Sequence, residues 1–432
     1  MLASTATTDE ERPLDPVSLY SDLAQGGPPL FFPDPPAPVT FNLDQGIPAE
    51  ETFPIEDLER LAVEVLHEDG PRALEYISFG YDEDEDQILY LATYIELVLG
   101  FTGLREELAK WTSAREGRQF GADNFILASG SVQAIALAIN AFVDPGDGVL
   151  LEAASFPYAQ RYMQMRGADV RSVAIDAEGI DTDDLERRIL EMKAEGVRPK
   201  MMYVIPTFQL PTCVVTPLDR RKRLLELAAE HEIVVLEDNI YGDLRYEGEP
   251  LPTLLSLDES GLVIQSHGFS KIVAPALRIG WVCGEEKMIE GLAAVRQDLG
   301  VSQWLARLMT AFMREGKLDP HIASVNDVYR RRRDVAVEAV REHCGEFVSF
   351  DVPHGGFYLW LELDERVDWG RVGQLAAERG VMCRPGEKFM AEGDARRFLR
   401  LAYSHAPDHE LVRGIEALGE AIRGAVSAPA GN

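Results

Sequence analysis

The sequence has few cysteines, no long apolar run and no signal-like N-terminus, and each absence excludes a class of protein. Its 432 residues include four cysteines, which are scattered without the spacing of a metal site. Together with the missing signal segment, this predicts a reduced, cytoplasmic protein that binds no metal. No apolar stretch approaches the roughly 18–20 residues that a membrane span requires, so we expect no membrane partner.

Positive charge is also scarce. The chain carries 73 acidic residues against 42 lysines and arginines, which gives a formal net charge of −31. Such a surface repels the phosphates of nucleic acids and acidic lipids, so we expect neither as a partner. Hydrophobic residues make up 46% of the chain, which is enough for a sizeable core, and the length exceeds that of one typical domain.

Four segments with different patterns follow one another along the chain. Residues 1–40 are polar and proline-rich and are expected to form an irregular N-terminal arm. Residues 41–110 have helical apolar spacing and would form the N-terminal part of a smaller domain and its connection, with an acidic and apolar segment near 79–99. Strand-like and amphipathic helical patterns then alternate over 111–310. Residues 311–432 begin with a long helical pattern, which strand-like segments and further helices follow.

This order of patterns predicts an α/β fold, in which a large doubly wound, mainly parallel sheet precedes a smaller α+β domain. The strands of the large sheet are expected at 124–129, 148–153, 169–175, 200–206, 232–238, 262–267 and 278–283.

The strongest single feature is a lysine directly after a predicted strand, in the segment HGFSKIVAPALRIGW. The amine of Lys271 can form an imine with an aldehyde if its surroundings lower its pKa. Ser270 and Arg278 suit a phosphate dianion, the serine by hydrogen bonding and the arginine by a two-pronged charged contact. Taken alone, the segment is equally compatible with a surface lysine at a strand end.

Two further strand ends have the character of ligand sites. In ASGSVQAIALAI, a glycine precedes Ser131 and Val132 at the predicted start of a helix, where free N–H groups and the helix dipole favour phosphate. Such junctions are common, so this signal is weak alone. In VVLEDNIYGDLRY, Asp238 ends a strand at the edge where α/β folds bind ligands. It could hold a pyridinium N–H, with Tyr241 near the ring hydroxyl, while Glu237 would face away as an ordinary strand-end charge.

These three features, in this order, resemble the fold-type-I pyridoxal-phosphate enzymes, specifically the class I/II aminotransferase family. The resemblance runs from about residue 42 to residue 418 and includes the smaller motifs NLDQGIP, LREELAKW, GGFYLW, RPGEKF and LRLAYS. It implies pyridoxal 5′-phosphate as the cofactor, an amino acid as the substrate, and a homodimer whose active sites lie at the subunit interface.

The resemblance also implies a role for individual residues. Lys271 would carry the cofactor as an imine and then move the substrate α-proton. Asp238 would pair with the pyridine nitrogen, and Tyr241 would hydrogen-bond the ring oxygen. Phe156 would stack on the cofactor ring, although a core aromatic is the alternative. Arg400 would bind the substrate α-carboxylate.

The cofactor phosphate would be held by a set of hydroxyl, amide and guanidinium groups. The residues that the resemblance implies are Ser131, Val132, Ser270, Arg278 and, from the neighbouring subunit, Tyr76.

The sequence departs from the family pattern beside the expected site. Leu210 stands where the family has an asparagine that donates to the ring oxygen and lies near the substrate carboxylate. Its loss leaves Tyr241 as the main partner of that oxygen and is expected to raise the imine pKa. His267 replaces a small residue and is either a packed strand-end histidine or a substrate contact. The segment 79–99 is longer than usual and either covers the active-site mouth or is a surface helix.

Three hypotheses follow. The leading one is an aminotransferase that exchanges an amino group between an amino acid and a 2-oxo acid. The departures favour instead other chemistry of the family: β/γ-elimination or replacement, decarboxylation or carbon–carbon bond formation, for example on an S-adenosylmethionine-like substrate. The third, the effector-sensing part of a transcription regulator, is disfavoured because residues 1–40 do not form a basic winged helix.

Overall fold

The structure is a computed structural model that describes residues 16–21, 24, 38–75, 96–390 and 397–426. The chain divides into two compact units, residues 1–34 and 35–432. In the first unit the structure describes a short 3-10 helix, η1 (Pro16–Leu19). The second unit contains the sheets and the helices that pack against them.

A seven-stranded, mainly parallel sheet forms the centre of the second unit. Across the sheet its strands are β2 (Phe125–Ala128), β10 (Gly280–Gly284), β9 (Val263–Gly268), β8 (Val234–Asp238), β7 (Pro199–Val204), β3 (Gly148–Glu152) and β4 (Asp169–Val173). Only β10 runs antiparallel to its neighbours among these strands. All seven predicted strands are confirmed, with each end within two residues of the prediction.

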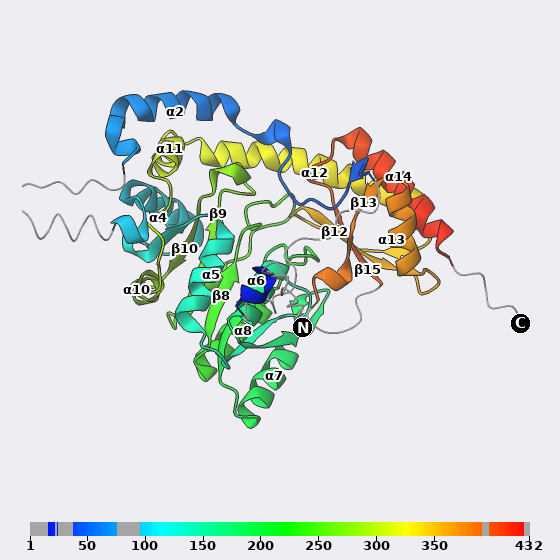
Figure 1. The fold of residues 1–432 in the computed structure, drawn as a ribbon, viewed down its shortest axis with the longest axis horizontal. Coiled ribbons are helices and arrows are strands. Elements are labelled where there is room, and N and C mark those ends of the chain that lie inside the picture. The colour runs from blue at the N-terminus through cyan, green and yellow to red at the C-terminus, as the bar shows by residue number, and fades with distance from the viewer. Residues whose placement is uncertain (1–15, 22–23, 25–37, 76–95, 391–396, 427–432) are drawn as a thin grey trace, which may run out of the picture. The chain divides into compact units, whose positions relative to one another are not determined.

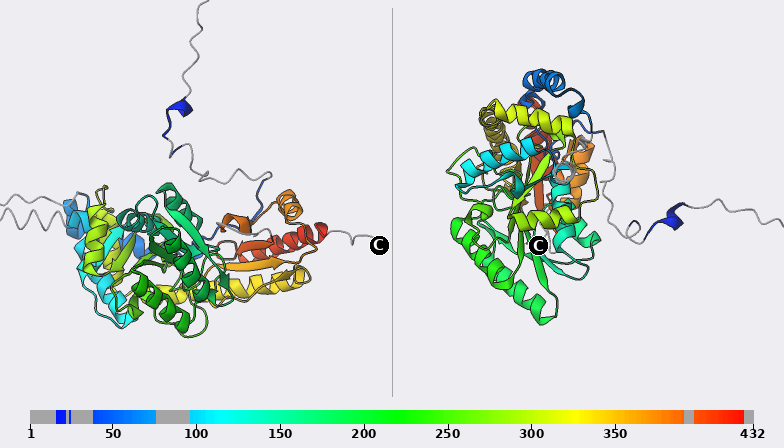
Figure 2. Two further views of the ribbon diagram at one scale, coloured as in Figure 1. Left: turned by 90° about the horizontal axis from the view of Figure 1, so that it is seen from below. Right: turned by 90° about the vertical axis from the view of Figure 1, so that its left-hand side faces the viewer.

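Helices lie on both sides of this sheet (Figures 1 and 2). They are α4 (Thr102–Glu116), α5 (Ser131–Phe142), α6 (Pro157–Met165), α7 (Thr182–Ala194), α8 (Leu218–His231), α9 (Leu254–Leu257) and α10 (Glu286–Ala294). The parallel strands are joined through helices, as in a doubly wound fold, because a parallel neighbour can be reached only by a crossover. The predicted fold class is therefore correct.

A smaller antiparallel sheet follows in the C-terminal part of the chain. Its strands, in order, are β11 (Val348–Ser349), β12 (Tyr358–Leu363), β15 (Phe398–Ala402) and β14 (Arg384–Pro385). Three helices accompany it: α12 (Leu318–His343), α13 (Trp369–Glu378) and α14 (Asp408–Gly424). Helices α12 and α14 run side by side (Figure 2). Strand β1 (Phe41–Asn42) pairs with β13 (Val381–Met382), which brings the start of the second unit to this region.

The remaining elements are short or lie near the beginning of the second unit. Helix α2 (Ile55–Asp69) packs against α11 (Gln303–Arg314), as Figure 1 shows. Short pieces are η2 (Glu50–Thr52), η3 (Gly70–Ala73), η4 (Ala122–Asn124), η5 (Pro275–Leu277), η6 (Gly386–Lys388), and the hairpin of β5 (Ile175–Asp176) and β6 (Gly179–Ile180). Most of the segment 79–99 lies outside the described residues. No helix in the described part of the chain is long and apolar enough to cross a membrane.

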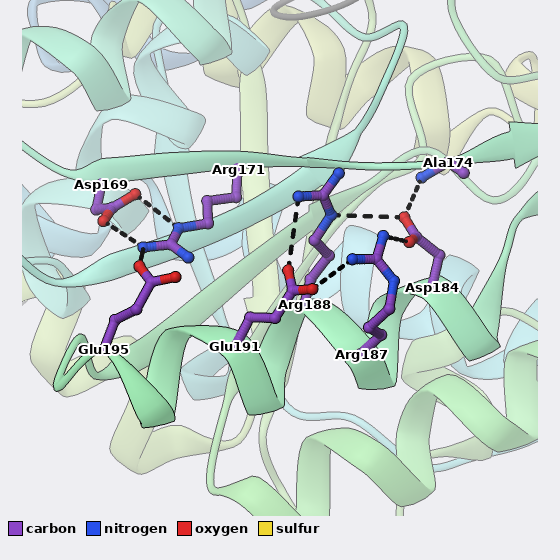
Figure 3. Close-up of polar contacts among 8 residues, drawn as sticks. All are labelled: Asp169, Arg171, Ala174, Asp184, Arg187, Arg188, Glu191 and Glu195. Atoms are coloured by element: carbon purple, nitrogen blue, oxygen red, sulfur yellow. Dashed lines mark hydrogen bonds and ion pairs between the residues drawn. The ribbon is translucent and has the colours of Figure 1, made fainter.

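Charged side chains of β4 and α7 form a series of surface ion pairs (Figure 3). Arg171 holds Asp169 in a two-pronged contact and reaches Glu195, just after α7, at 2.6 Å. Within the helix, Arg187 pairs with Asp184 and Glu191. Residues three and four apart face each other on a helix, so these pairs follow from the sequence spacing.

Candidate active site

The Lys271 side chain projects from the turn that follows β9. Its Nζ donates a hydrogen bond to the Gly46 carbonyl oxygen at 2.7 Å. Burial, and to a lesser degree the Arg400 guanidinium, lowers the pKa of the Lys271 amine to about 8. About a tenth of this amine is therefore uncharged at pH 7, far more than for a solvated lysine, and the uncharged form is the one that can act as a nucleophile or base.

Asp238 lies at the carboxyl end of β8 and is 3% exposed. Its Oδ2 accepts a hydrogen bond from the Tyr203 hydroxyl at 2.7 Å, and its Oδ1 accepts one from the Ile240 amide at 3.2 Å. Burial raises the pKa of Asp238, and these hydrogen bonds oppose the rise. Since a carboxylate can accept about four hydrogen bonds, Asp238 retains acceptor capacity for one more N–H.

Tyr241 follows in the loop after β8 and lies beside the lysine. The Lys271 Nζ is 5.9 Å from the centre of the Tyr241 ring and 6.0 Å from that of Phe357. The Tyr241 hydroxyl is 2.9 Å from the Tyr358 hydroxyl. Burial raises the pKa of Tyr241 above its usual value, so this phenol keeps its proton and can donate it in a hydrogen bond.

Gly130, the start of α5 and the Arg278 side chain lie together in a group that we call the α5 cradle. Gly130 has φ +87° immediately before the helix, and Arg278 also has a positive φ, of 50°. The Arg278 guanidinium donates to the Ser129 carbonyl at 2.6 Å, and a Cβ on Gly130 would lie 2.6 Å from it. The cradle thus requires glycine, and it combines a guanidinium with the first N–H groups of a helix, which have no partner inside the helix.

Of the expected phosphate ligands, the structure brings Ser131 and Arg278 to the same cradle, because both adjoin Gly130. Val132 is the second residue of α5, and Ser270 is half-buried in the turn next to Lys271. Tyr76 lies outside the described residues.

Arg400 lies on β15 between two aromatic rings. Its guanidinium carbon is 4.4 Å from the centre of the Tyr358 ring and 4.7 Å from that of Phe389. It donates to the Asp44 backbone oxygen and, at 2.9 Å, to the Asp44 carboxylate, which also binds Arg384. The Arg400 Nε has no hydrogen-bond partner among the described residues, so the arginine keeps a buried donor for a further acceptor.

Phe156 and Leu210 are the other apolar residues expected at the site. Phe156 is half-buried before the first turn of α6, and its ring centre is 5.3 Å from that of Tyr158. Leu210 is 4% exposed and precedes Pro211 through a cis peptide bond.

His267 points away from this group. Glu237 and Gln265 are hydrogen-bonded to each other, and His267 shares the sheet face of Gln265, opposite to that of Asp238. Its Nδ1 accepts from the Gly268 amide, so Nε2 carries the proton and donates to Asp243 at 2.9 Å.

The His267 ring is stacked on Trp281 with centres 4.8 Å apart, and it lines a cavity of about 320 Å³ with Trp111 and Arg115. These contacts are those of the packed strand-end histidine, one of the two alternatives given for this residue.

Glu237 also faces away from Asp238, as expected, but it is not an ordinary strand-end charge. It is fully buried, and its carboxylate accepts hydrogen bonds from the Leu254 and Leu255 amides at the start of α9. The expectation of an ordinary strand-end charge was wrong because this carboxylate caps α9, a helix that comes later in the chain.

Four residues near the site were not expected from the sequence: Asp44, Gly46, Tyr203 and Tyr358. Three of them lie inside quoted motifs, Asp44 and Gly46 in NLDQGIP and Tyr358 in GGFYLW, but the motifs did not indicate what these residues do. Tyr203 lies within a buried strand and has the pattern of a core aromatic.

The fold and the kinds of group gathered here are those of a fold-type-I enzyme that uses pyridoxal 5′-phosphate. The sequence matches the family model for aminotransferase class I and II over residues 97–418. The chain belongs to this aminotransferase family.

Individual relatives agree with this assignment. The chain is 34% identical over 384 residues to aromatic-amino-acid aminotransferase 1 of Thermococcus litoralis, a match that covers 88% of each protein. It is 31% identical over 384 residues to 2-aminoadipate transaminase of Thermus thermophilus, with 88% of this chain and 89% of that protein covered. Kynurenine aminotransferase of Pyrococcus horikoshii, solved with PMP, superposes with a TM-score of 0.85 at 31% identity, over 96% of this chain and 99% of that one.

The residues present fit the cofactor. The glycine-dependent cradle suits its phosphate, the spare acceptor capacity of buried Asp238 suits a pyridinium N–H, and the amine of Lys271 suits its aldehyde.

Proposed function

We propose that this aminotransferase exchanges amino groups between an amino acid and a 2-oxo acid, with Lys271 as the residue that binds the cofactor covalently and moves the proton. The proposal rests on the position and the lowered pKa of the Lys271 amine. This amine lies beside Tyr241, and its pKa is about 8. When bound, the cofactor withdraws electrons from the substrate α-carbon.

The side chains around the lysine have separate tasks in this proposal. Asp238, held by Tyr203, would accept from the protonated ring nitrogen, and Tyr241 would donate to the ring oxygen. Arg400 binds the substrate carboxylate and so fixes the orientation of the α-carbon, which decides the bond that reacts. Lys271 Nζ would take the substrate α-proton and later give it back, because its lowered pKa suits both transfers.

We propose that the phosphate is held by the α5 cradle with Ser131, Val132, Ser270 and Arg278, and that Phe156 covers the ring. The named relatives act on aromatic amino acids, on 2-aminoadipate and on kynurenine. An amino acid with an extended or aromatic side chain is therefore the class to try first.

The experiment separates transamination from the other reactions of the family. The purified protein, loaded with pyridoxal 5′-phosphate, is mixed with one amino acid at a time while cofactor absorbance and product mass are followed. A transaminase converts its cofactor fully to the amine form and releases the 2-oxo acid. Product release without that conversion would instead support elimination, replacement or decarboxylation, the alternative that Leu210 favours.

A second measurement tests the site. Borohydride reduction of the loaded protein, followed by peptide mass analysis, is expected to find the cofactor on Lys271. A tag on another lysine, or a colourless protein that takes up no coenzyme, would refute the proposed site.

We also propose a cytoplasmic homodimer whose active sites are shared between subunits, with Tyr76 reaching the neighbouring phosphate. Light scattering is expected to give twice the chain mass of 48.0 kDa, and Tyr76→Phe is expected to weaken coenzyme binding. A monomer with full activity would contradict this arrangement.

A further inference from the structure

The Tyr358 side chain makes contact with three parts of the proposed site. Its hydroxyl is 2.9 Å from that of Tyr241, its ring lies against the Arg400 guanidinium, and its hydroxyl packs against Gly46. A Cβ on Gly46 would lie 1.8 Å from the Tyr358 hydroxyl oxygen, so the fit requires glycine in this loop. The same glycine accepts the hydrogen bond of Lys271.

The two tyrosine hydroxyls are each other's hydrogen-bond partners within the described residues. Leu210 is an apolar side chain and can donate to neither of them. Each hydroxyl has one proton to donate, so the pair can be arranged in only two ways: Tyr241 donates to Tyr358, or Tyr358 donates to Tyr241.

The surroundings favour Tyr358 as the donor. The cofactor ring oxygen would accept the hydrogen bond that Tyr241 donates, which leaves the lone pairs of the Tyr241 oxygen free to accept one from Tyr358. The Arg400 guanidinium, 4.4 Å from the centre of the Tyr358 ring, makes that phenol a better donor, although burial raises the pKa of Tyr358 overall. Hydrogen bonds in such a chain strengthen one another.

We propose that Tyr358 is a positioning residue, whose hydroxyl donates to Tyr241 and thereby directs the Tyr241 proton to the cofactor ring oxygen, while its ring supports Arg400. The inference rests on the proposed site. Under this proposal Tyr358 acts on the cofactor through Tyr241.

The hydroxyl is tested by the pH titration of cofactor absorbance in the loaded protein. Tyr358→Phe is expected to raise the midpoint by about half a pH unit, because Tyr241 becomes a weaker donor. Tyr241→Phe is expected to raise it further. In the Tyr241→Phe background, Tyr358→Phe is expected to cause no additional shift, since its effect passes through Tyr241.

The chain offers a matched control. Tyr403 is a fully buried tyrosine that follows β15, and its hydroxyl donates to the Gly356 carbonyl at 2.9 Å. Tyr403→Phe removes a buried hydroxyl of the same kind and is expected to leave the midpoint unchanged.

The ring is tested separately. Tyr358→Phe keeps the aromatic surface under Arg400, so the Kd of a non-reacting carboxylate analogue is expected to stay at the wild-type value. Tyr358→Leu removes that surface and is expected to raise the Kd about fivefold. This split between two substitutions at one position would not arise from general damage to the fold.

An unchanged midpoint in Tyr358→Phe, or an equal shift in the Tyr241→Phe background, would overturn the inference. A protein that takes up no coenzyme, or carries the borohydride tag elsewhere than on Lys271, would instead overturn the proposed site. The two failures are therefore distinguishable in the same set of proteins.

Discussion

Among the places where arginines and carboxylates meet in this molecule, the surface of β4 and α7 and the surroundings of Arg400 differ most usefully. In the first region, the Arg187 side chain is 52% exposed and Glu195 is 58% exposed (Figure 3). In the second, Asp44 is 3% exposed and Arg400 is 10% exposed. The two regions contain the same types of residue but differ in their exposure to solvent.

That difference determines what the charges do. Exposed pairs are solvated whether or not they meet, so each contributes little to stability. Buried groups lose their water, so their protonation depends on a few neighbours, as the lowered pKa of Lys271 and the raised pKa of Asp238 illustrate. The reactive groups of the site are therefore buried groups whose charged forms destabilise the fold.

The largest expected effect is the pH dependence of stability caused by Lys271 in the coenzyme-free protein. Its pKa is about 8 in the folded protein against 10.5 for an ordinary lysine, so the folded state binds this proton less tightly. The resulting penalty is fully present below pH 8 and disappears as the pH rises to 10.5. Over that window, the unfolding free energy of wild type should rise relative to Lys271→Met by about 3 kcal/mol.

Denaturant titrations of both proteins at several pH values measure this difference. Lys287→Met is the control, because Lys287 is 87% exposed and paired only at the surface. A wild-type curve parallel to that of Lys271→Met from pH 8 to 10.5 would show that the amine is not desolvated.

The second prediction concerns the carboxylate contact of Arg400. Arg400→Lys keeps the charge but loses the planar fork, and hydrogen bonds to charged groups contribute about 1.5–3 kcal/mol. We expect kcat/KM to fall about 10- to 100-fold, mainly through KM. Arg171→Lys, the same change on β4 at the surface, should leave kcat/KM at the wild-type value. Equal losses of kcat/KM in Arg400→Lys and Arg171→Lys would show that the two regions do not differ in their importance for activity.

The third prediction restores the family asparagine. In Leu210→Asn, an added amide donor near the ring oxygen should lower the midpoint of the cofactor titration by about half to one pH unit. Leu210→Met retains an apolar side chain of similar volume and should leave the midpoint unchanged. If Leu210→Asn has the wild-type midpoint, leucine at this position does not raise the pKa of the cofactor imine.

Much of the fold and part of the site could be predicted because their signals are local. The strands of the large sheet follow from apolar runs, and the expected positions of Lys271 and Asp238 follow from strand ends. A strand end places its side chain at the ligand-binding edge of the sheet whatever the rest of the chain does.

The partners of these residues could not be predicted, because tertiary packing brings them from distant segments. Gly46 lies 225 positions from Lys271, Tyr358 lies 117 from Tyr241, and Asp44 lies 356 from Arg400. Glu237 was misjudged because it caps a helix that begins only 17 residues later but reaches it through the fold of the intervening loop. Sequence spacing contains no information on such contacts, although it does predict the ion pairs of α7.

The smallest expected effect tests the surface region itself. Arg171 links β4 to the end of α7 through Asp169 and Glu195, which makes it the best connected arginine of Figure 3. Because its partners are partly solvated, Arg171→Gln should lower the unfolding free energy by no more than about 1 kcal/mol, and added salt should reduce the difference further. Urea titrations at low and high salt measure both. A loss as large as the Lys271 effect, and insensitive to salt, would mean that this surface stabilises the fold as a buried network does, and that exposure does not distinguish the two regions.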